Sequence, residues 1–104
     1  MRYFSTRDKK LNFSFTEIFS RGLAPDGGLF IPSELKKYSS SELKSLQNLS
    51  YTDLATEIIS SFCSPDLDKQ KLKILVSKAY NNFIIKEVVK IKKIGDIHLL
   101  ELYH

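Results

Sequence analysis

The sequence contains a single cysteine, no run of apolar residues long enough to cross a bilayer, and no block of charge of one sign. Cys63 has no disulfide partner within the chain, which fits a reducing compartment. The opening "MRYFSTRDKK" lacks the apolar segment of a secretory signal peptide. These absences together predict a soluble, cytoplasmic protein without a membrane-spanning helix.

The charge is mildly basic but dispersed. Sixteen lysines and arginines against twelve aspartates and glutamates give a formal charge of +4. The lysines are scattered through every expected element, which is typical of a solvated surface rather than of a nucleic-acid footprint. The aromatic residues fall mainly on predicted core faces, so a base-stacking platform is absent as well. Nucleic acid is therefore not an expected partner.

The remaining composition indicates one small domain. The chain has 104 residues, of which 42% are hydrophobic and 27% charged, the balance of an ordinary globular domain. A domain of this size buries only about two thirds of its unfolded surface, which leaves little margin for a second core or a deep private active site. We predict the α+β class, with short strands, four or so helices and a C-terminal β-hairpin.

The first predicted elements are a strand and a well-marked helix. "RYFST" (residues 2–6) is rich in β-favouring residues and precedes the charged, turn-like "RDKK" (residues 7–10). Ser14 and Glu17 have the spacing of a capping box, in which each side chain satisfies the other residue's backbone amide. Gly22 can adopt the left-handed conformation that ends a helix.

The next segment, "GLAPDGGLFIP" (residues 22–32), concentrates turn-forming residues. Pro25 suits the second position of a turn, and Asp26 can accept hydrogen bonds from backbone amides two residues further on. Gly27 and Gly28 permit a positive φ or the close approach of another backbone. We expect a tight corner that leads from the helix into a short buried strand, "LFIP". A phosphate-cradling loop is the rival interpretation, which the missing Lys-Ser/Thr pair and the missing following helix disfavour.

Three further helices are predicted. Ser39 and Glu42 form a second capping box in "SSSELKSLQNL", and two amphipathic helices follow over residues 50–62 and 68–83. The first of these two carries a helical face made of Leu54, Ala55, Ile58, Ile59 and Phe62. The second carries a stripe, expected to be core or interface, made of Leu72, Leu75, Val76, Ala79, Tyr80 and Phe83.

The pattern becomes β-like in the last segment. "VVKIKKI" and "IHLLELYH" flank Gly95-Asp96, which suits a type II′ hairpin over residues 88–103. The second arm, Ile97 to Tyr103, is apolar on both faces and needs more cover than the preceding elements supply. We expect this arm to be partly uncovered and to promote self-association or limited stability. The chain stops within this strand, so we also expect it to be a fragment.

No catalytic constellation is evident from spacing. His98 and His104, with Glu101 between them, could hold a metal only if another element supplied more ligands, so no metal site is predicted. Cys63 is interpreted as a small buried apolar residue rather than a nucleophile, because neither histidine lies near it in sequence.

Four polar residues in two segments are candidate site residues. Asp26 could act as a general base, and Ser5, Thr6 and Arg7 could grip an anion. Turn chemistry and strand-end polarity explain the same residues, so both interpretations stay open. From the residues alone, the conclusion is a small soluble α+β domain.

Several segments together carry a resemblance to a known family. "YFSTR", "GLAPDGGLFIP", "SYTDLATEIISSF", "AYNNF" and "HLLELYH" resemble, in order and spacing, the N-terminal region of the pyridoxal-phosphate-dependent threonine synthases. Threonine-synthase-like proteins of animals share the pattern. The resemblance covers essentially the whole chain. It implies that residues 1–104 form the N-terminal domain of a fold-type II enzyme, with 87–104 beginning the strand region that leads into an absent catalytic domain.

The resemblance also implies a chemistry. The family's phosphate-eliminating lyase reaction converts O-phospho-L-homoserine and water to L-threonine and phosphate, in threonine biosynthesis, with pyridoxal 5′-phosphate as electron sink. In the family a strand of the "LELYH" type runs into Gly-Pro-Thr and then Ala-Phe-Lys-Asp, whose lysine forms the Schiff base. That lysine is expected just beyond His104, and no lysine of this chain inherits its role. The chain alone is therefore expected to be inactive and to bind no cofactor productively.

The same resemblance suggests where a site would lie. The corner Asp26 to Gly28 and the strand end Ser5, Thr6 and Arg7 are expected nearest the domain junction or substrate site, with His104 leading toward the cofactor. A non-catalytic remnant or interaction domain is the alternative function. The codons that follow His104 would separate the two.

Overall fold

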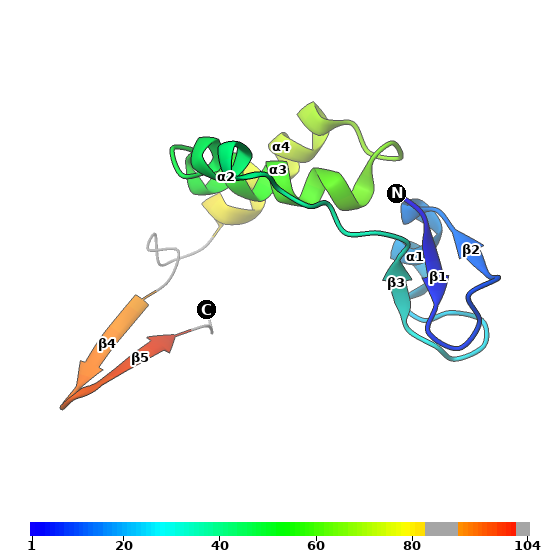
Figure 1. Ribbon diagram of the computed structural model, residues 1–104, viewed down its shortest axis with the longest axis horizontal. Helices are drawn as coiled ribbons and strands as arrows, with labels where there is room; N and C mark the ends of the chain where they lie inside the picture. Colours follow the sequence, from blue (N-terminus) through cyan, green and yellow to red (C-terminus); the bar gives the residue numbers. More distant parts are fainter. Residues whose placement is uncertain (83–89, 102–104) are drawn as a thin grey trace.

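The computed structural model describes residues 1–82 and 90–101. Within these residues it contains helices and short antiparallel strands, which confirms the predicted α+β class (Figure 1). The elements in chain order are β1 (Tyr3–Ser5), β2 (Asn12–Phe13), α1 (Phe15–Arg21), β3 (Phe30–Pro32), α2 (Ser40–Leu46), α3 (Tyr51–Cys63), α4 (Lys69–Asn81), β4 (Lys90–Ile94) and β5 (Ile97–Glu101).

The N-terminal sheet has the strand order β2-β1-β3, so the first strand of the chain lies in its centre. Both pairings are antiparallel, and Ser5 at the end of β1 lies opposite Phe30 at the start of β3. The expected buried strand "LFIP" is in fact half-buried over Phe30–Pro32 and lies at an edge of the sheet, with β1 as its only partner among the described strands. β2 was not predicted, since two residues are too few to show an alternating pattern.

Both predicted capping boxes are present. The Ser14 side chain accepts from the Glu17 amide, and the Glu17 carboxylate accepts from the Ser14 amide, at the start of α1. Ser39 and Glu42 repeat the arrangement at the start of α2. Gly22 ends α1 with a positive φ of 74°, as expected, but its ψ of −47° lies outside the predicted left-handed helical region. These local signals depend on residues three apart, so they do not need the rest of the fold.

The helical core lies between α3 and α4. Cys63, Leu72 and Val76 are buried together, which confirms the interpretation of Cys63 as a small buried apolar residue. The partly buried residues around this cluster are Phe15, Ala55, Leu67 and Tyr80. Two ion pairs also join α3 to α4, Asp53 with Lys73 at 2.6 Å and Glu57 with Lys69.

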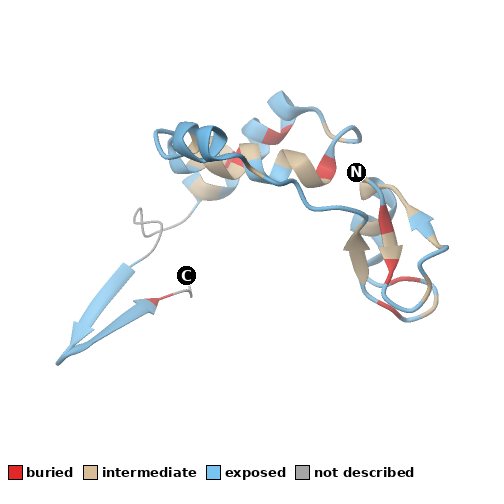
Figure 2. Cartoon of the chain, in the orientation of Figure 1, coloured by how far each residue is buried: buried red, intermediate tan, exposed pale blue. Residues whose placement is uncertain are grey.

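The predicted apolar faces are only partly buried. On α4, Leu72 is 5% exposed, whereas Leu75 is 54% exposed and Ala79 is also exposed. Ile58 and Ile59 of α3 are exposed too. Figure 2 shows that buried residues are few along both helices. The remaining stripe residue predicted on α4, at position 83, lies outside the described residues. The helical layer therefore has apolar surface that the other described elements leave uncovered.

The N-terminus is anchored to the end of α3. The Tyr3 hydroxyl donates to the Phe62 carbonyl at 2.6 Å, and the amino group of Met1 donates to the Ser64 carbonyl at 2.5 Å. Burial raises the pKa of the Tyr3 hydroxyl above its usual range. The sheet and the helical layer are thus joined through the first residues of the chain.

The predicted hairpin is present over the described residues 90–101. Ile94 pairs with Ile97 across a turn in which Gly95 has a φ of 61°. No non-glycine residue among those described has a positive φ, so Asp96 does not, as a type II′ turn requires. The outer positions of the predicted hairpin, 88, 89, 102 and 103, lie outside the described residues.

The hairpin is uncovered, as predicted for its second arm. Ile97 is 71% exposed, and Leu99 and Leu100 are exposed as well. In Figure 1 the two strands extend away from the helices and the N-terminal sheet. The radius of gyration is 17.1 Å, whereas a compact domain of this length has one of about 13 Å. The chain is therefore elongated, and its hairpin carries exposed apolar surface of the kind that binds a further partner.

Candidate functional site

The candidate residues meet at one end of the N-terminal sheet. Because β1 and β3 are antiparallel and pair at Ser5 and Phe30, the residues after β1 face the loop that precedes β3. The sheet continues there, since the Thr6 amide donates to the Leu29 carbonyl at 2.9 Å. The Leu29 amide in return donates to the Thr6 hydroxyl oxygen at 2.9 Å. The strand end and the glycine-rich loop, predicted separately, thus form one structure, which we call the corner (residues 5–7 and 24–29).

The loop of the corner is a tight turn, as the sequence predicts. The Gly27 amide donates to the Ala24 carbonyl at 2.9 Å, which places Pro25 and Asp26 at the two central positions. The Ala24 amide then donates to the Gly28 carbonyl at 3.0 Å. These bonds close the loop upon itself and fix Asp26 against β1.

Asp26 and Ser5 form the centre of the corner. The Ser5 hydroxyl donates to Asp26 Oδ1 at 2.7 Å, and the Gly28 amide donates to the same oxygen at 2.9 Å. Ser5 Oγ also accepts from the Arg7 amide at 3.1 Å. Ser5 is completely buried, so this hydroxyl exchanges no bonds with water. The three bonds form a clasp between β1 and the loop.

The surroundings of Asp26 bear on the two interpretations that the sequence leaves open, a general base and a turn residue. The hydrogen bond from Ser5, followed by that from the Gly28 amide, lowers the pKa of Asp26 below its usual range. A carboxylate with a lowered pKa is a poor proton acceptor near neutral pH. Asp26 Oδ2 is a buried atom without a hydrogen-bond partner among the described residues. The arrangement suits a residue that holds its neighbours in place.

Arg7 lies over the glycine turn. Its Nη1 donates to the Asp26 backbone carbonyl at 3.0 Å, so the side chain is attached to the loop while the residue remains exposed. A Cβ on Gly27, whose φ is +75°, would lie 3.2 Å from that nitrogen. A Cβ on Gly28 would lie 2.2 Å from Ser5 Oγ and 3.0 Å from Thr6 Oγ1. Space therefore requires glycine at position 28, whereas at Gly27 the positive φ is the stronger constraint, since the Arg7 side chain could move by a few tenths of an ångström.

Other candidates lie elsewhere. His104 is outside the described residues, so its predicted position toward a cofactor stays a prediction. Cys63 is buried, and burial raises the pKa of its thiol, so the thiolate is disfavoured. Among the described residues, no group of three or more histidine, cysteine, aspartate or glutamate side chains is placed to hold a metal. No helix in the described part of the chain has the length and apolar character to span a membrane.

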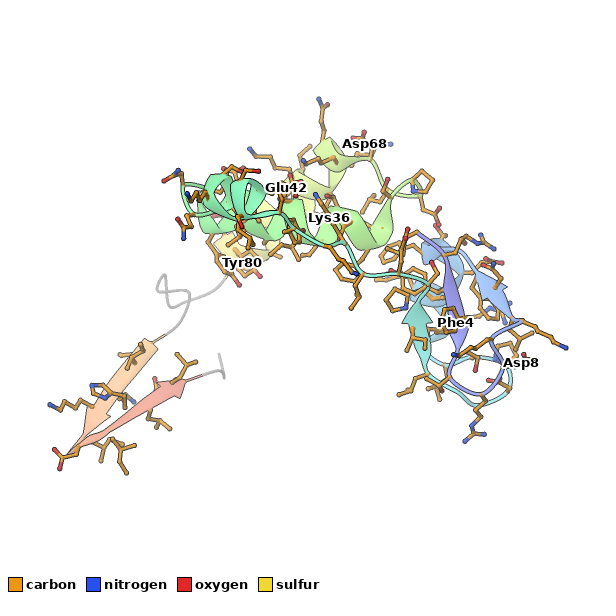
Figure 3. All side chains as sticks on the ribbon, viewed as in Figure 1. Phe4, Asp8, Lys36, Glu42, Asp68 and Tyr80 are labelled. Atoms are coloured by element: carbon orange, nitrogen blue, oxygen red, sulfur yellow. The ribbon has the colours of Figure 1, made fainter. Side chains whose placement is uncertain are left out.

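One further feature could not be predicted from the sequence, an open surface depression of about 620 Å³ beside the helices. Figure 3 shows Lys36, one of its lining residues, well away from Asp8 at the end of the sheet. Its lining residues come from three separate segments and are Met1, Glu34, Leu35, Lys36, Lys37 and Ser61. None of them belongs to the corner, so this depression and the corner are separate.

Comparisons with known proteins identify the family. A family model described as the threonine synthase N terminus matches residues 2–80. The chain belongs to this family. It is 36% identical to the threonine synthase of Schizosaccharomyces pombe over 104 residues, which are 98% of the chain and 20% of that protein. It is 35% identical to human threonine synthase-like 2 over 106 residues, 100% of the chain and 22% of that protein.

The structural comparison agrees with the family assignment. The crystal structure of pyridoxal-phosphate-bound threonine synthase from Brucella melitensis matches with a TM-score of 0.86 and 28% identity, over all of this chain and 23% of that one. The fold class expected for a threonine synthase N-terminal region is confirmed. The chain spans about a fifth of the length of the relatives that it matches.

The described residues fit only part of what pyridoxal phosphate needs. Every described lysine is exposed, so none lies in the buried, supported setting that an imine-forming lysine needs. The corner offers a guanidinium and a hydroxyl, which suit an oxyanion such as a phosphate group. An imine-forming lysine would have to come from outside the described residues.

Proposed function

We propose that this chain is the N-terminal domain of a threonine synthase that converts O-phospho-L-homoserine and water to L-threonine and phosphate. The observation that supports the proposal is the match of the threonine synthase N terminus model to residues 2–80, together with relatives aligned over nearly the whole chain. The domain works with a catalytic domain that supplies the lysine for pyridoxal phosphate. The cofactor, when bound there, delocalises the negative charge that develops on the substrate carbon.

In this proposal the chain's own contribution is to build one wall of the substrate site. The corner places an exposed guanidinium at the end of the sheet, where it bonds the loop carbonyl of Asp26 and the Ser5–Asp26 bond ties that loop to β1. Asp26 and Gly28 hold the loop close to β1, and Thr6 presents a hydroxyl beside it. The exposed apolar hairpin packs against the catalytic domain, which covers Ile97 and Leu99. The enzyme is cytoplasmic.

The test is direct. The reading frame that continues beyond codon 104 is expressed together with this chain, and phosphate release from O-phosphohomoserine is measured along with threonine formation. We expect turnover that requires both the added segment and pyridoxal phosphate. The 104-residue chain alone should release no phosphate. A stop codon directly after His104, or a folded full-length protein that binds the cofactor without turnover, would contradict the proposal.

A non-catalytic function is the second candidate. It is favoured by the similarity to human threonine synthase-like 2, which covers the whole chain at 35% identity. In this case the domain is an interaction module that keeps the family fold. The same assay distinguishes the two, because such a module would release no phosphate from phosphohomoserine in any length of the protein.

A further inference from the structure

The corner uses nearly all of its own hydrogen-bond donors. The amides of Thr6, Arg7, Gly27, Gly28 and Leu29 each donate to a carbonyl, hydroxyl or carboxylate oxygen within the corner. Within the corner, the side-chain donors without an acceptor among the described residues are the Thr6 hydroxyl and the guanidinium N–H groups of Arg7 that do not bond the Asp26 carbonyl. Both residues are exposed, so these donors face solvent rather than the core.

Arg7 is fixed at both ends although it is exposed. Its backbone amide is held by Ser5 Oγ and its guanidinium by the Asp26 carbonyl, and Ser5 and Asp26 are bonded to each other. Surface arginines are usually mobile, because holding a long side chain in one position is entropically costly. Here the fully buried Ser5 holds the backbone amide of Arg7, and the absence of a side chain on Gly27 leaves room for the Arg7 guanidinium.

The charge of Arg7 is not neutralised by contact. It makes no ion pair within 4 Å among the described residues. Two carboxylates belong to this region: Asp8, whose Oδ1 accepts from the Lys10 amide, and Asp26, whose Oδ1 accepts from Ser5 and whose charge attracts Arg7 without an ion-pair contact. Lys9 and Lys10 add two exposed cations to the same turn. The local charge therefore favours an anion.

From this geometry we propose that Thr6 and Arg7 form an oxyanion-binding site, and that Ser5 and Asp26 are the residues that position it. The ligand class is a phosphate monoester. The planar guanidinium can donate two parallel hydrogen bonds, and the hydroxyl adds a third donor, which matches three non-bridging phosphate oxygens. The assignment of this phosphate to phosphohomoserine or to the cofactor rests on the proposed function. Binding of a phosphate group at Thr6 and Arg7 does not depend on the proposed function.

The first experiment uses the 104-residue chain and no turnover. The Arg7 Nε–Hε resonance and the Thr6 amide resonance are followed by NMR while inorganic phosphate, O-phosphoserine or acetate is added at constant ionic strength. We expect saturable shifts at both positions with the two phosphates and weaker ones with acetate. Acetate binding as tight as phosphate would overturn the assignment of ligand class, and linear, non-saturating shifts would overturn the site.

Matched variants separate a built site from general attraction. Arg7→Gln should weaken phosphate binding about tenfold or more, the loss expected for a charge-assisted bond. Arg21→Gln removes the same charge from an exposed arginine on α1 and should leave binding within about twofold. Equal losses in the two variants would mean that only diffuse attraction operates.

The positioning role has its own readout. Ser5→Ala removes the hydroxyl that links Arg7 to Asp26, so phosphate should bind more weakly and the Arg7 Nε–Hε resonance should broaden toward that of a free side chain. Arg7→Lys keeps the charge but loses the planar fork, so it should bind between wild type and Arg7→Gln, and it tests the site even if Ser5→Ala does not fold. Wild-type binding by Arg7→Lys would refute the geometric argument.

A last comparison distinguishes this proposal from the proposed function. In the full-length protein, Arg7→Gln should raise the KM for phosphohomoserine more than it lowers kcat. If the full-length wild type shows no turnover while the 104-residue chain still binds phosphate at Arg7, the enzyme assignment fails and the anion site stands. If turnover is normal and unaffected by Arg7→Gln, the anion site fails and the enzyme assignment stands.

Discussion

Replacing Gly28 by alanine should destabilise the domain through one contact. The added Cβ would lie 2.2 Å from Ser5 Oγ, closer than real Cβ contacts come, and 3.0 Å from Asp26 Oδ1 and from Thr6 Oγ1. Ser5 is fully buried and bonded to both Asp26 and the Arg7 amide, so its hydroxyl cannot move aside without breaking the clasp. Overpacking of this kind costs about 1–3 kcal/mol.

A second substitution isolates the contact. Ser5→Ala alone should cost about 1–2 kcal/mol, because the Arg7 amide loses its acceptor. In the double variant the shortest clash is gone, so the total loss should be smaller than the sum of the two single losses by about 1 kcal/mol or more. The remaining contacts at 3.0 Å keep the double variant below wild type in stability.

The measurement is urea unfolding followed by far-ultraviolet circular dichroism, with the free energy of unfolding compared across the four proteins. Additive losses, within about 0.5 kcal/mol, would mean that Gly28 and Ser5 act independently and would refute the account of the clasp. A Gly28→Ala variant as stable as wild type would refute it as well.

Three further outcomes are expected. Cys63 should resist alkylation in the folded chain and react once urea unfolds it, because its thiol is buried and its pKa raised; rapid reaction of the folded chain would contradict this. In urea unfolding, Leu72→Ala should lower the free energy of unfolding by about 2–5 kcal/mol, because Leu72 is buried. Leu75→Ala, at an exposed position of the same helix, should change it by no more than about 0.5 kcal/mol. Asp26 and Glu17 have lowered pKa values in the fold, so their contribution to the free energy of unfolding should be present above about pH 4 and lost as the pH falls below it. When unfolding is measured as a function of pH, Asp26→Asn should lose less stability on acidification than wild type does.

The local features of this fold could be predicted from the sequence. Ser14 with Glu17 and Ser39 with Glu42 act across three residues, and Gly95 needs only its own backbone conformation to reverse the hairpin. Such signals hold in any tertiary context that permits a helix or a turn.

Features that depend on long-range pairing could not be predicted. β2 exists because Phe13 pairs with Tyr3, and "LFIP" lies at an edge because no further strand of the sheet adds to it. On α4, periodicity indicated an apolar stripe but could not tell that Leu72 meets α3 while Leu75 faces outward. Burial is decided by what packs against a face, and a single helix does not carry that information.

The candidate site lies between these two cases. The sequence singled out Asp26, Gly27 and Gly28 for their turn chemistry, and Ser5, Thr6 and Arg7 as a polar strand end. That they are one unit depends on the antiparallel register of β1 and β3, which brings Ser5 to Asp26 across 21 positions. The clasp, and the fixed position of the arginine that it creates, were therefore visible only in the structure.

The bond from Tyr3 to the end of α3 has a consequence for how the chain folds. β1 precedes both of its sheet partners in the sequence, yet it lies in the centre of the sheet, and the acceptor for its tyrosine is 59 residues further along. α1 and α2 have their capping residues nearby and can begin to form during synthesis, whereas the first strand must wait for β3 and then for Phe62. Contacts of such long separation are slow to form. We therefore expect residues 3–5 to be secured later in folding than the helices that follow them in the sequence, because their partners are the more distant ones.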